Sequence, residues 1–191
     1  SIGYIYNSAK IAALCGAYSV TFHAAYYMQE KPEKVFASVK EHVRHILKKL
    51  EDEGLKIWLR PETTGRVSQF GSLQELLKLS QELEYVMPCI DFSHLHARTN
   101  GKFNSYEEFS SILAEVEKAL GKEALQNMHI HVSGIAYGEK GEKHHLNLQD
   151  SDINFRELCK AWRDFKIKGI VISESPNIEG DALLLKKTYE K

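Results

Sequence analysis

Five short apolar runs recur along the chain, and a helix-forming segment follows each of them. The runs are rich in β-branched and aromatic residues and are bounded by turn residues, so they predict strands. We place these strands at residues 17–23, 55–62, 85–91, 128–132 and 169–173. Regular alternation of strands and helices predicts an α/β fold with a parallel sheet and outer helices. Right-handed crossovers then leave two architectures, an open doubly wound sheet or a (β/α) barrel.

The segments between the strands carry helix start and stop signals. A first helix is expected over residues 3–15, and Pro32 is expected to open a long helix that ends at Gly54. Two Ser-x-x-Glu patterns predict capping boxes, namely Ser72 with Glu75 and Ser105 with Glu108. The polar stretches after the third and fourth strands, residues 92–101 and 134–152, are interpreted as loops.

The barrel is favoured because no strand is followed by the Gly-rich phosphate-binding motifs of nucleotide-binding open sheets. A complete eight-unit barrel takes about 250 residues. This chain has 191 residues and starts at Ser1 within a helical pattern. We therefore predict a (β/α)8 TIM barrel that here lacks its first two to three βα units. No linker or low-complexity tract divides the sequence, so residues 1–191 are expected to form a single domain.

The charge balance and the cysteines constrain the partners and the location of the protein only weakly. Lys and Arg total 25 against 26 for Asp and Glu, which gives no overall electrostatic footprint for nucleic acid, although a local patch can exist within a neutral total. The apolar runs are too short to cross a bilayer, so no membrane partner is expected. The three cysteines are odd in number and far apart, which favours a reducing, cytoplasmic location. We expect a monomer.

Each of the five predicted strands has a residue that can bind a metal at its end or next to its last residue. In a barrel these ends share one mouth, where active sites lie. Carboxylates gathered in one mouth repel one another unless a cation binds there, and imidazole with carboxylate suits Zn, Mn or Fe. One histidine at a strand end is more often a hydrogen-bonding residue than a ligand, but five such ends favour a metal site. The residues are His23, Glu62, Asp91, His131 and Glu174.

Other histidines are more ambiguous. His94 and His96 are two residues apart, so only one of them is expected to face the site. One of His144 and His145 is an equally open candidate, because the polar stretch around them could be merely solvated. His129 shares a strand face with His131 and is interpreted as structural.

Six motifs in a fixed order resemble a known family. They are His23 after a strand, Pro61-Glu62-Thr63-Thr64-Gly65, Cys89-Ile90-Asp91-Phe92-Ser93-His94, His129-Ile130-His131-Val132-Ser133, His145-Leu146-Asn147-Leu148 and Glu174-Ser175-Pro176. Together they resemble endonuclease IV, the metal-dependent apurinic/apyrimidinic endonuclease of the xylose isomerase-like TIM-barrel superfamily. The resemblance covers essentially the whole chain.

The resemblance implies two or three Zn²⁺ ions and their ligands. His23 and Glu62 would bind the first ion, Glu62 would bridge to a second held by Asp91, His131 and Glu174, and His94 with His145 would bind the third. The family has an aspartate two residues before the last of these histidines. Here that position holds Lys143, with Glu142 beside it, so the third site is either lost or uses Glu142 in a shifted loop.

The implied reaction is hydrolysis of the phosphodiester 5′ to an abasic site in double-stranded DNA, a step in DNA repair. Metal ions would activate the attacking water, orient the phosphate and stabilise the leaving oxyanion. Glu62 and Glu174 would be the catalytic carboxylates, with Glu174 also orienting the nucleophile. Arg66 and Arg98 are candidate phosphate contacts, although solvated surface arginines are an equal alternative.

Two other functions stay open. Sugar isomerases and epimerases of the same superfamily bind one Mn²⁺ or Mg²⁺ with two Glu, one Asp and one His, a set that Glu62, Asp91, His131 and Glu174 would satisfy. An isomerase has no need of His23, His94 and His145, which favours the endonuclease. The third alternative is a binding protein that keeps the fold without catalysis. The only residue that favours it is Lys143, which occupies the position of the family's aspartate.

Overall fold

The computed structural model describes residues 2–191, and these form two compact units. The first unit comprises the chain up to Glu62 together with Ser68–Cys89. The second comprises Thr63–Val67 together with Ile90–Lys191. Each unit is described by itself.

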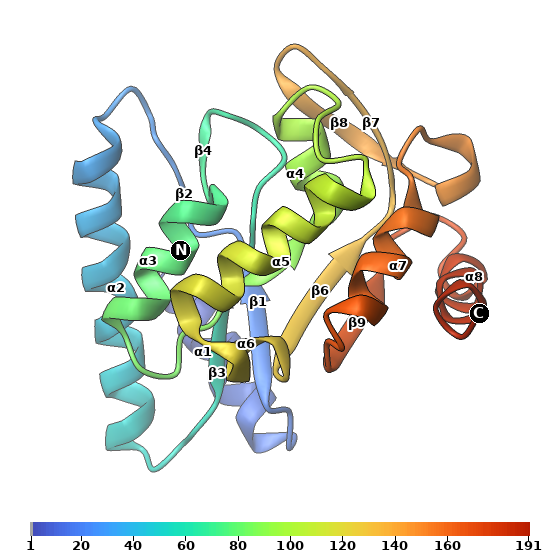
Figure 1. Cartoon of the computed structure of the whole chain (residues 1–191). Helices are drawn as coiled ribbons and strands as arrows, with labels where there is room; N and C mark the ends of the chain where they lie inside the picture. Colours follow the sequence, from blue (N-terminus) through green and yellow to red (C-terminus); the bar gives the residue numbers. More distant parts are fainter. Residues whose placement is uncertain (1) are drawn as a thin grey trace. The chain divides into compact units, whose positions relative to one another are not determined.

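The first unit contains three helices and two pairs of short strands (Figure 1). Strand β1 pairs in parallel with β3, with Phe22 opposite Pro61, and β2 pairs antiparallel with β4. Isolated bridges join Leu59 to Val86 and Glu62 to Cys89, both in parallel. The elements are α1 (Ile2–Leu14), β1 (Ser19–Phe22), β2 (Ala25–Tyr26), α2 (Pro32–Asp52), β3 (Trp58–Pro61), β4 (Gln69–Phe70) and α3 (Leu73–Glu82).

Helix α2 shows how the sequence builds this unit. Proline stands at its first turn, where the missing N–H costs no hydrogen bond. Its buried positions recur at helical spacing and form one face of the core together with Leu59 and Phe70. The buried residues are Val35, Val39, Val43, Ile46 and Leu50. The predicted capping box of Ser72 and Glu75 is present at the start of α3.

The second unit is built on a sheet of order β5-β6-β9, with β6 and β9 parallel and Met128 opposite Gly169. A two-stranded antiparallel hairpin, β7–β8, packs against α4. The elements are β5 (Cys89–Asp91), α4 (Phe92–Arg98), α5 (Tyr106–Leu120), α6 (Lys122–Leu125), β6 (Met128–Val132), β7 (Gly134–Gly138), β8 (Gly141–Leu146), a 3₁₀ turn (Leu148–Asp150), α7 (Phe155–Asp164), β9 (Gly169–Ser173) and α8 (Glu179–Tyr189).

Three aromatic rings form the centre of this second core. Phe92 of α4 lies edge-on to Phe109 of α5 at 6.0 Å and to Trp162 of α7 at 5.8 Å between centroids. All three side chains are buried. The ring that follows Asp91 in sequence therefore fixes the start of α4 to two outer helices.

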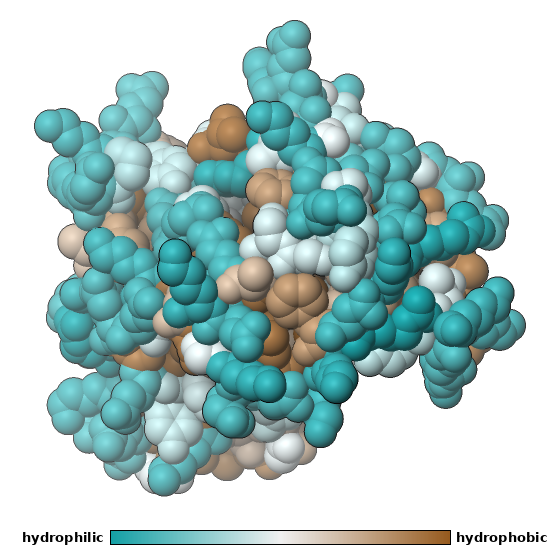
Figure 2. Space-filling view, in the orientation of Figure 1, coloured by the Kyte–Doolittle hydropathy of each residue, from teal (hydrophilic) through white to brown (hydrophobic). Residues whose placement is uncertain are grey.

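The outer faces of α2, α3, α5 and α7 carry no exposed large hydrophobic side chain. Figure 2 shows mainly hydrophilic side chains on the face drawn, as expected where amphipathic helices turn their polar sides outward. Across residues 2–191, every helix is too short or too polar to span a membrane.

Two of the predicted loops are wrong. Residues Phe92–Arg98 form helix α4, because Asp91 Oδ1 accepts the His94 backbone N–H at 2.7 Å and caps the first turn. Residues 134–146 form the β7–β8 hairpin, in which Gly138 pairs with Gly141 across a two-residue turn. By contrast, the last two predicted strands have the expected bounds, and parallel pairing is confirmed for β1–β3 and β6–β9.

Candidate metal centre

The first unit brings two of the predicted ligands together. Phe22 and Pro61 are register partners in β1 and β3, so the residues that follow them emerge at the same edge. The Glu62 N–H donates to Phe22 O at 3.0 Å. As a result His23 Nε2 lies 3.5 Å from Glu62 Oε2, with the carboxylate buried and the imidazole 41% exposed. The pair offers one nitrogen and one oxygen to a cation.

The second unit gathers three further predicted ligands at its strand ends. Asp91 is the last residue of β5, His131 lies near the end of β6, and Glu174 follows β9. Each offers one ligand atom, and these atoms lie within 4.8 Å of one another. His131 Nδ1 is 3.3 Å from Glu174 Oε1. This Asp91–His131–Glu174 group combines two carboxylates and one imidazole, a donor set that suits a divalent metal.

Asp91 shows that this group fits a cation. Its Oδ1 accepts the His94 N–H, whereas its Oδ2 is buried and accepts no hydrogen bond from the part of the chain described. His94 Nδ1 lies 3.5 Å from Oδ2. A buried carboxylate oxygen without a hydrogen bond is costly unless a positive charge faces it. The residues present therefore fit a bound divalent metal ion.

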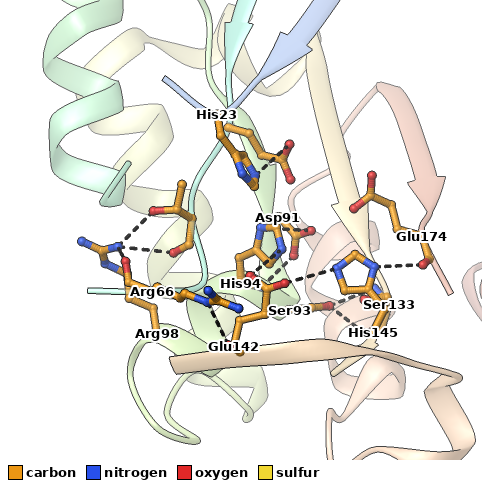
Figure 3. Close-up of polar contacts among 12 residues, drawn as sticks. His23, Arg66, Asp91, Ser93, His94, Arg98, Ser133, Glu142, His145 and Glu174 are labelled. Atoms are coloured by element: carbon orange, nitrogen blue, oxygen red, sulfur yellow. Dashed lines mark hydrogen bonds and ion pairs between the residues drawn. The ribbon is translucent and has the colours of Figure 1, made fainter. Parts of the chain in front are cut away.

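A pair of histidines lies in the same unit with an acidic partner, Glu142 (Figure 3). His94 Nε2 is 3.6 Å from Glu142 Oε2, and His145 Nε2 is 3.9 Å from Glu142 Oε1. The two imidazole rings are 5.8 Å apart between centroids. All three ligand atoms lie within 4.8 Å of one another. We name these residues the His94–Glu142–His145 group.

Hydrogen bonds orient both imidazoles toward Glu142. His94 Nδ1 donates to Thr63 O at 2.9 Å, and His145 Nδ1 donates to Glu174 O at 3.0 Å. Because a carbonyl oxygen only accepts, these contacts place the proton of each neutral ring on Nδ1 and the lone pair on Nε2, the atom that faces Glu142. Metal-binding histidines commonly have this arrangement, with a backbone carbonyl fixing the tautomer.

The histidines next to these ligands in sequence differ from them in exposure or orientation. His144 is exposed, and its neighbour His145 is the one that faces Glu142. His129 is 7% exposed and stacks edge-on with His131, 5.2 Å between centroids. His96 is fully buried on a different side of α4 from His94, because two residues in a helix differ by about 200°.

His96 belongs to a polar network that runs from its buried ring to the exposed Asp152, rather than to the candidate ligands. Its Nδ1 donates to Lys102 O at 2.8 Å, and its Nε2 lies 3.1 Å from Asp152 Oδ1. Tyr137 O–H donates to the other oxygen of Asp152 at 2.6 Å. Burial acts to raise the pKa of Asp152, but the net direction is downward because Tyr137 and His96 stabilise the carboxylate. The network ties β7 to α4.

Tyr137→Phe is expected to lower the free energy of unfolding by roughly 1–2 kcal/mol, since one hydrogen bond to a carboxylate is lost. Burial, followed by the hydrogen bond to Asp152, raises the pKa of Tyr137 to about 12. An unfolded tyrosine titrates near 10, so this contribution is complete below about pH 10 and is lost as the pH rises toward about 12. Urea unfolding at about pH 8 and about pH 11 should show a smaller gap between variant and parent at the higher pH. A gap independent of pH would contradict this account.

The two predicted phosphate contacts are engaged within the second unit. Arg66 Nε donates to Glu142 O at 3.0 Å. Arg98 Nη1 donates to Thr64 Oγ1 at 3.0 Å and to the Arg66 carbonyl. Both arginines therefore hold a loop beside the His94–Glu142–His145 group (Figure 3).

A protein-family model described as a xylose isomerase-like TIM barrel matches residues 1–189. The chain belongs to the xylose isomerase-like TIM-barrel family. The predicted TIM-barrel fold class is confirmed by this match, which agrees with the α/β elements and parallel strand pairs described above.

One curated relative and two solved structures are similar to this chain over nearly its whole length. The curated relative "Uncharacterized protein MJ0133" of Methanocaldococcus jannaschii is 48% identical over 191 residues, which span all of this chain and 69% of that protein. The crystal structure of endonuclease IV from Thermus thermophilus matches with a TM-score of 0.68 and 22% identity, covering 100% of this chain and 68% of that one. A D-tagatose 3-epimerase-like protein matches with a TM-score of 0.68 and 19% identity, covering 99% and 67%. The chain thus spans about two thirds of each of these proteins, and the two structural likenesses establish the fold only.

Sequence reasoning missed the part played by Glu142, which it considered only as an alternative. The usable signal was the Gly138-Glu139-Lys140-Gly141 turn, because glycines flanking two polar residues favour a tight hairpin. A hairpin at this turn places Glu142 at the start of a strand rather than in a solvated loop.

Proposed function

We propose that this TIM-barrel protein is a metal-dependent endonuclease that hydrolyses the phosphodiester 5′ to an abasic site in double-stranded DNA. His23 and Glu62 are ligands of one ion, and Asp91, His131 and Glu174 are ligands of another. Zn²⁺ is the proposed metal, because imidazole is present in each set.

The observation that carries the proposal is the His94–Glu142–His145 group. A single-metal isomerase needs one set of carboxylates and imidazole, and the Asp91–His131–Glu174 group already supplies three members of such a set. A second set of two imidazoles and one carboxylate, with both rings held by carbonyl oxygens, is additional to that need. Additional metal ions are the usual means of stabilising both the attacking and the leaving oxygen in phosphoryl chemistry.

The reaction requires water to attack phosphorus while the bond to the 3′-oxygen breaks, which yields a 3′-hydroxyl and a 5′-phosphate on the abasic sugar. Bound metal ions would supply Lewis acidity and a lowered pKa for the water. Among the protein groups, Glu174 is only partly buried, at 31% side-chain exposure, so its carboxylate can orient an incoming water. Glu62 is the second proposed catalytic carboxylate, and it is nearly buried beside His23.

The competing function is a sugar epimerase with one Mn²⁺ or Mg²⁺. The epimerase-like structure and the endonuclease IV structure match this chain with the same TM-score, so the fold favours neither function over the other. In that chemistry two of the carboxylates would transfer protons next to a carbonyl. The His94–Glu142–His145 group would then be dispensable, which gives the two functions different outcomes on mutation.

A monomer in a reducing, cytoplasmic environment is proposed as the working form. Cys15, Cys89 and Cys159 are all free thiols. Burial raises the pKa of Cys159 to about 12, so this thiol is a poor nucleophile and behaves as part of the core.

The deciding experiment uses the full-length natural protein and a 5′-labelled duplex with one abasic-site analogue. We expect two or three Zn per chain by elemental analysis and a single nick on the 5′ side of the analogue. His145→Ala should lose one equivalent of metal together with incision. The matched control His144→Ala, an exposed histidine one residue away, should retain both.

The endonuclease proposal would be overturned by one Mn²⁺ or Mg²⁺ per chain, no nicking, and turnover of a ketose. Retention of all metal and all incision by His145→Ala would remove the observation that carries the proposal.

A further inference from the structure

The loop Thr63–Val67, which we call the strap, touches three candidate ligands of the second unit. Its Thr63 side chain accepts the Asp91 N–H at 2.8 Å. The Thr63 carbonyl accepts from His94 Nδ1 at 2.9 Å. Further along, the Gly65 carbonyl accepts the Glu142 N–H at 2.9 Å. One short loop thus fixes positions in both metal-binding groups of this unit.

Close packing between the strap and Glu142 requires glycine. A Cβ atom added at Gly65 would lie 2.6 Å from Glu142 Cβ and 3.2 Å from His94 Cδ2. The Glu142 Cβ atom is near the backbone and cannot move aside as the end of a flexible side chain would. A Cβ at Gly141 would lie 2.1 Å from the Gly65 carbonyl oxygen. The strap and the hairpin therefore interlock at two glycines.

A β-bulge in β8 turns Glu142 toward the histidines. Ala136 pairs with His144 and Tyr137 with Glu142, so Lys143 is an extra residue without a partner in β7. In a regular strand side chains alternate, and residues 142 and 145 would point to opposite faces. The extra residue shifts this alternation by one and puts Glu142 and His145 on one side. The Lys143 side chain instead runs along Gly138.

Two arginines lock the strap in place. Arg98 Nη1 donates to Thr64 Oγ1 and to the Arg66 carbonyl, and so holds the middle of the strap against α4. Arg66 Nε then donates to the Glu142 carbonyl at 3.0 Å. With the Gly65 contact on the other side, both backbone polar groups of Glu142 are fixed by the strap.

We propose that Glu142 is the carboxylate ligand of a separate metal ion held with His94 and His145, and that the bulge at Lys143 and the Gly65–Arg66–Arg98 strap position it. Arg66 and Arg98 are positioning residues here, in place of the phosphate contacts expected from sequence. The inference rests on the metal chemistry proposed above, and it assigns the ligand that the Lys143 substitution left open.

Metal binding without DNA tests the proposal. The full-length protein is stripped of metal and titrated with Co²⁺ alone, with absorption spectra and elemental analysis as readouts. Gly65→Ala, Arg98→Ala and Glu142→Gln should each weaken one Co²⁺ equivalent by roughly 10–100-fold, the cost of disturbing a ligand or its support, and leave the other equivalents unchanged. Arg66→Ala should give a smaller change in the affinity for the same Co²⁺ equivalent. Because the Arg66 side chain is exposed, misfolding would not explain this change. Arg44→Ala, which breaks an exposed ion pair with Glu41 on α2, is the matched control.

The double variant Glu142→Gln/Lys143→Asp separates geometry from spacing. If the bulge sets the ligand position, an aspartate at 143 should not restore the lost equivalent. Recovery of that equivalent would overturn the proposal, as would wild-type Co²⁺ affinity in both Gly65→Ala and Arg98→Ala. His94→Ala distinguishes failure of the strap proposal from failure of the proposed function. If it loses one equivalent while the strap variants do not, only the strap is wrong, and if it loses none, the proposed function fails with it.

Discussion

Asp91→Asn is expected to empty the Asp91–His131–Glu174 group of metal while the fold survives. The amide oxygen of asparagine can still accept the His94 N–H, so the cap of α4 is kept. What is lost is the negative charge at Oδ2, the buried oxygen without a hydrogen bond. Changes around a ligand typically cost 10–100-fold in metal affinity, so loss of the ligand charge should exceed ~100-fold. Incision should fall by roughly 10³-fold, since metal catalysis supplies several kcal/mol.

Elemental analysis, a thermal melt and the abasic-site nicking assay check this prediction together. Asp52→Asn is the matched control, because it makes the same chemical change at an exposed ion pair with Lys48 at the end of α2. Asp91→Asn protein with full metal content and full incision would show that this aspartate is only a helix cap.

Phe92→Ala should cause the largest loss of stability. The ring is fully buried and lies against Phe109 and Trp162. Removing a buried phenylalanine typically costs 3–5 kcal/mol through lost burial and the cavity left behind. That is a large share of the 5–15 kcal/mol that stabilises an ordinary domain. Because Phe92 follows Asp91 directly, loosening of α4 should also weaken metal binding.

Urea unfolding of Phe92→Ala, Trp162→Ala and the double variant measures the effect. The cycle should reveal a coupling of about 0.5–1.5 kcal/mol between the two rings. Tyr4→Ala, at a side chain that is 81% exposed, is the control and should change stability by no more than about 0.5 kcal/mol. A loss below about 1.5 kcal/mol for Phe92→Ala would mean that the surrounding helices collapse onto the vacated space.

Local signals in the sequence predicted much of the fold. The capping boxes at Ser72 and Ser105 are both present, because each depends only on hydrogen bonds between side chains and backbone N–H groups three residues apart. The strands at residues 128–132 and 169–173 have the predicted bounds, since each is a compact apolar run between turn residues. In the first unit the predicted strand over 55–62 began too early, because pairing with β1 starts only at Trp58 although the apolar run starts at Leu55.

The missed features depend on contacts between segments far apart in the chain. Nothing in the residues near Glu142 indicates that Gly65, 77 positions earlier, accepts its N–H. Helix α4 was missed because the sequence suggested that Asp91 was a ligand, whereas it also caps a helix. Of the predicted ligands, the structure gathers Asp91 with His131 and Glu174, pairs His23 with Glu62, and places His94 beside His145. Their occupation by metal stays a prediction.

The bulge at Lys143 has a consequence for how such hairpins tolerate insertions and deletions. Glu142 and His145 face one way with one extra residue between them, and a carboxylate two residues before the histidine would face the same way in a strand without a bulge. A carboxylate-x-x-His sequence with a bulge and a carboxylate-x-His sequence without one are therefore interchangeable in three dimensions. Deleting Lys143 should be silent at the His94–Glu142–His145 group, and an alignment that forces the two spacings into one column would pair a ligand with a lysine that points elsewhere.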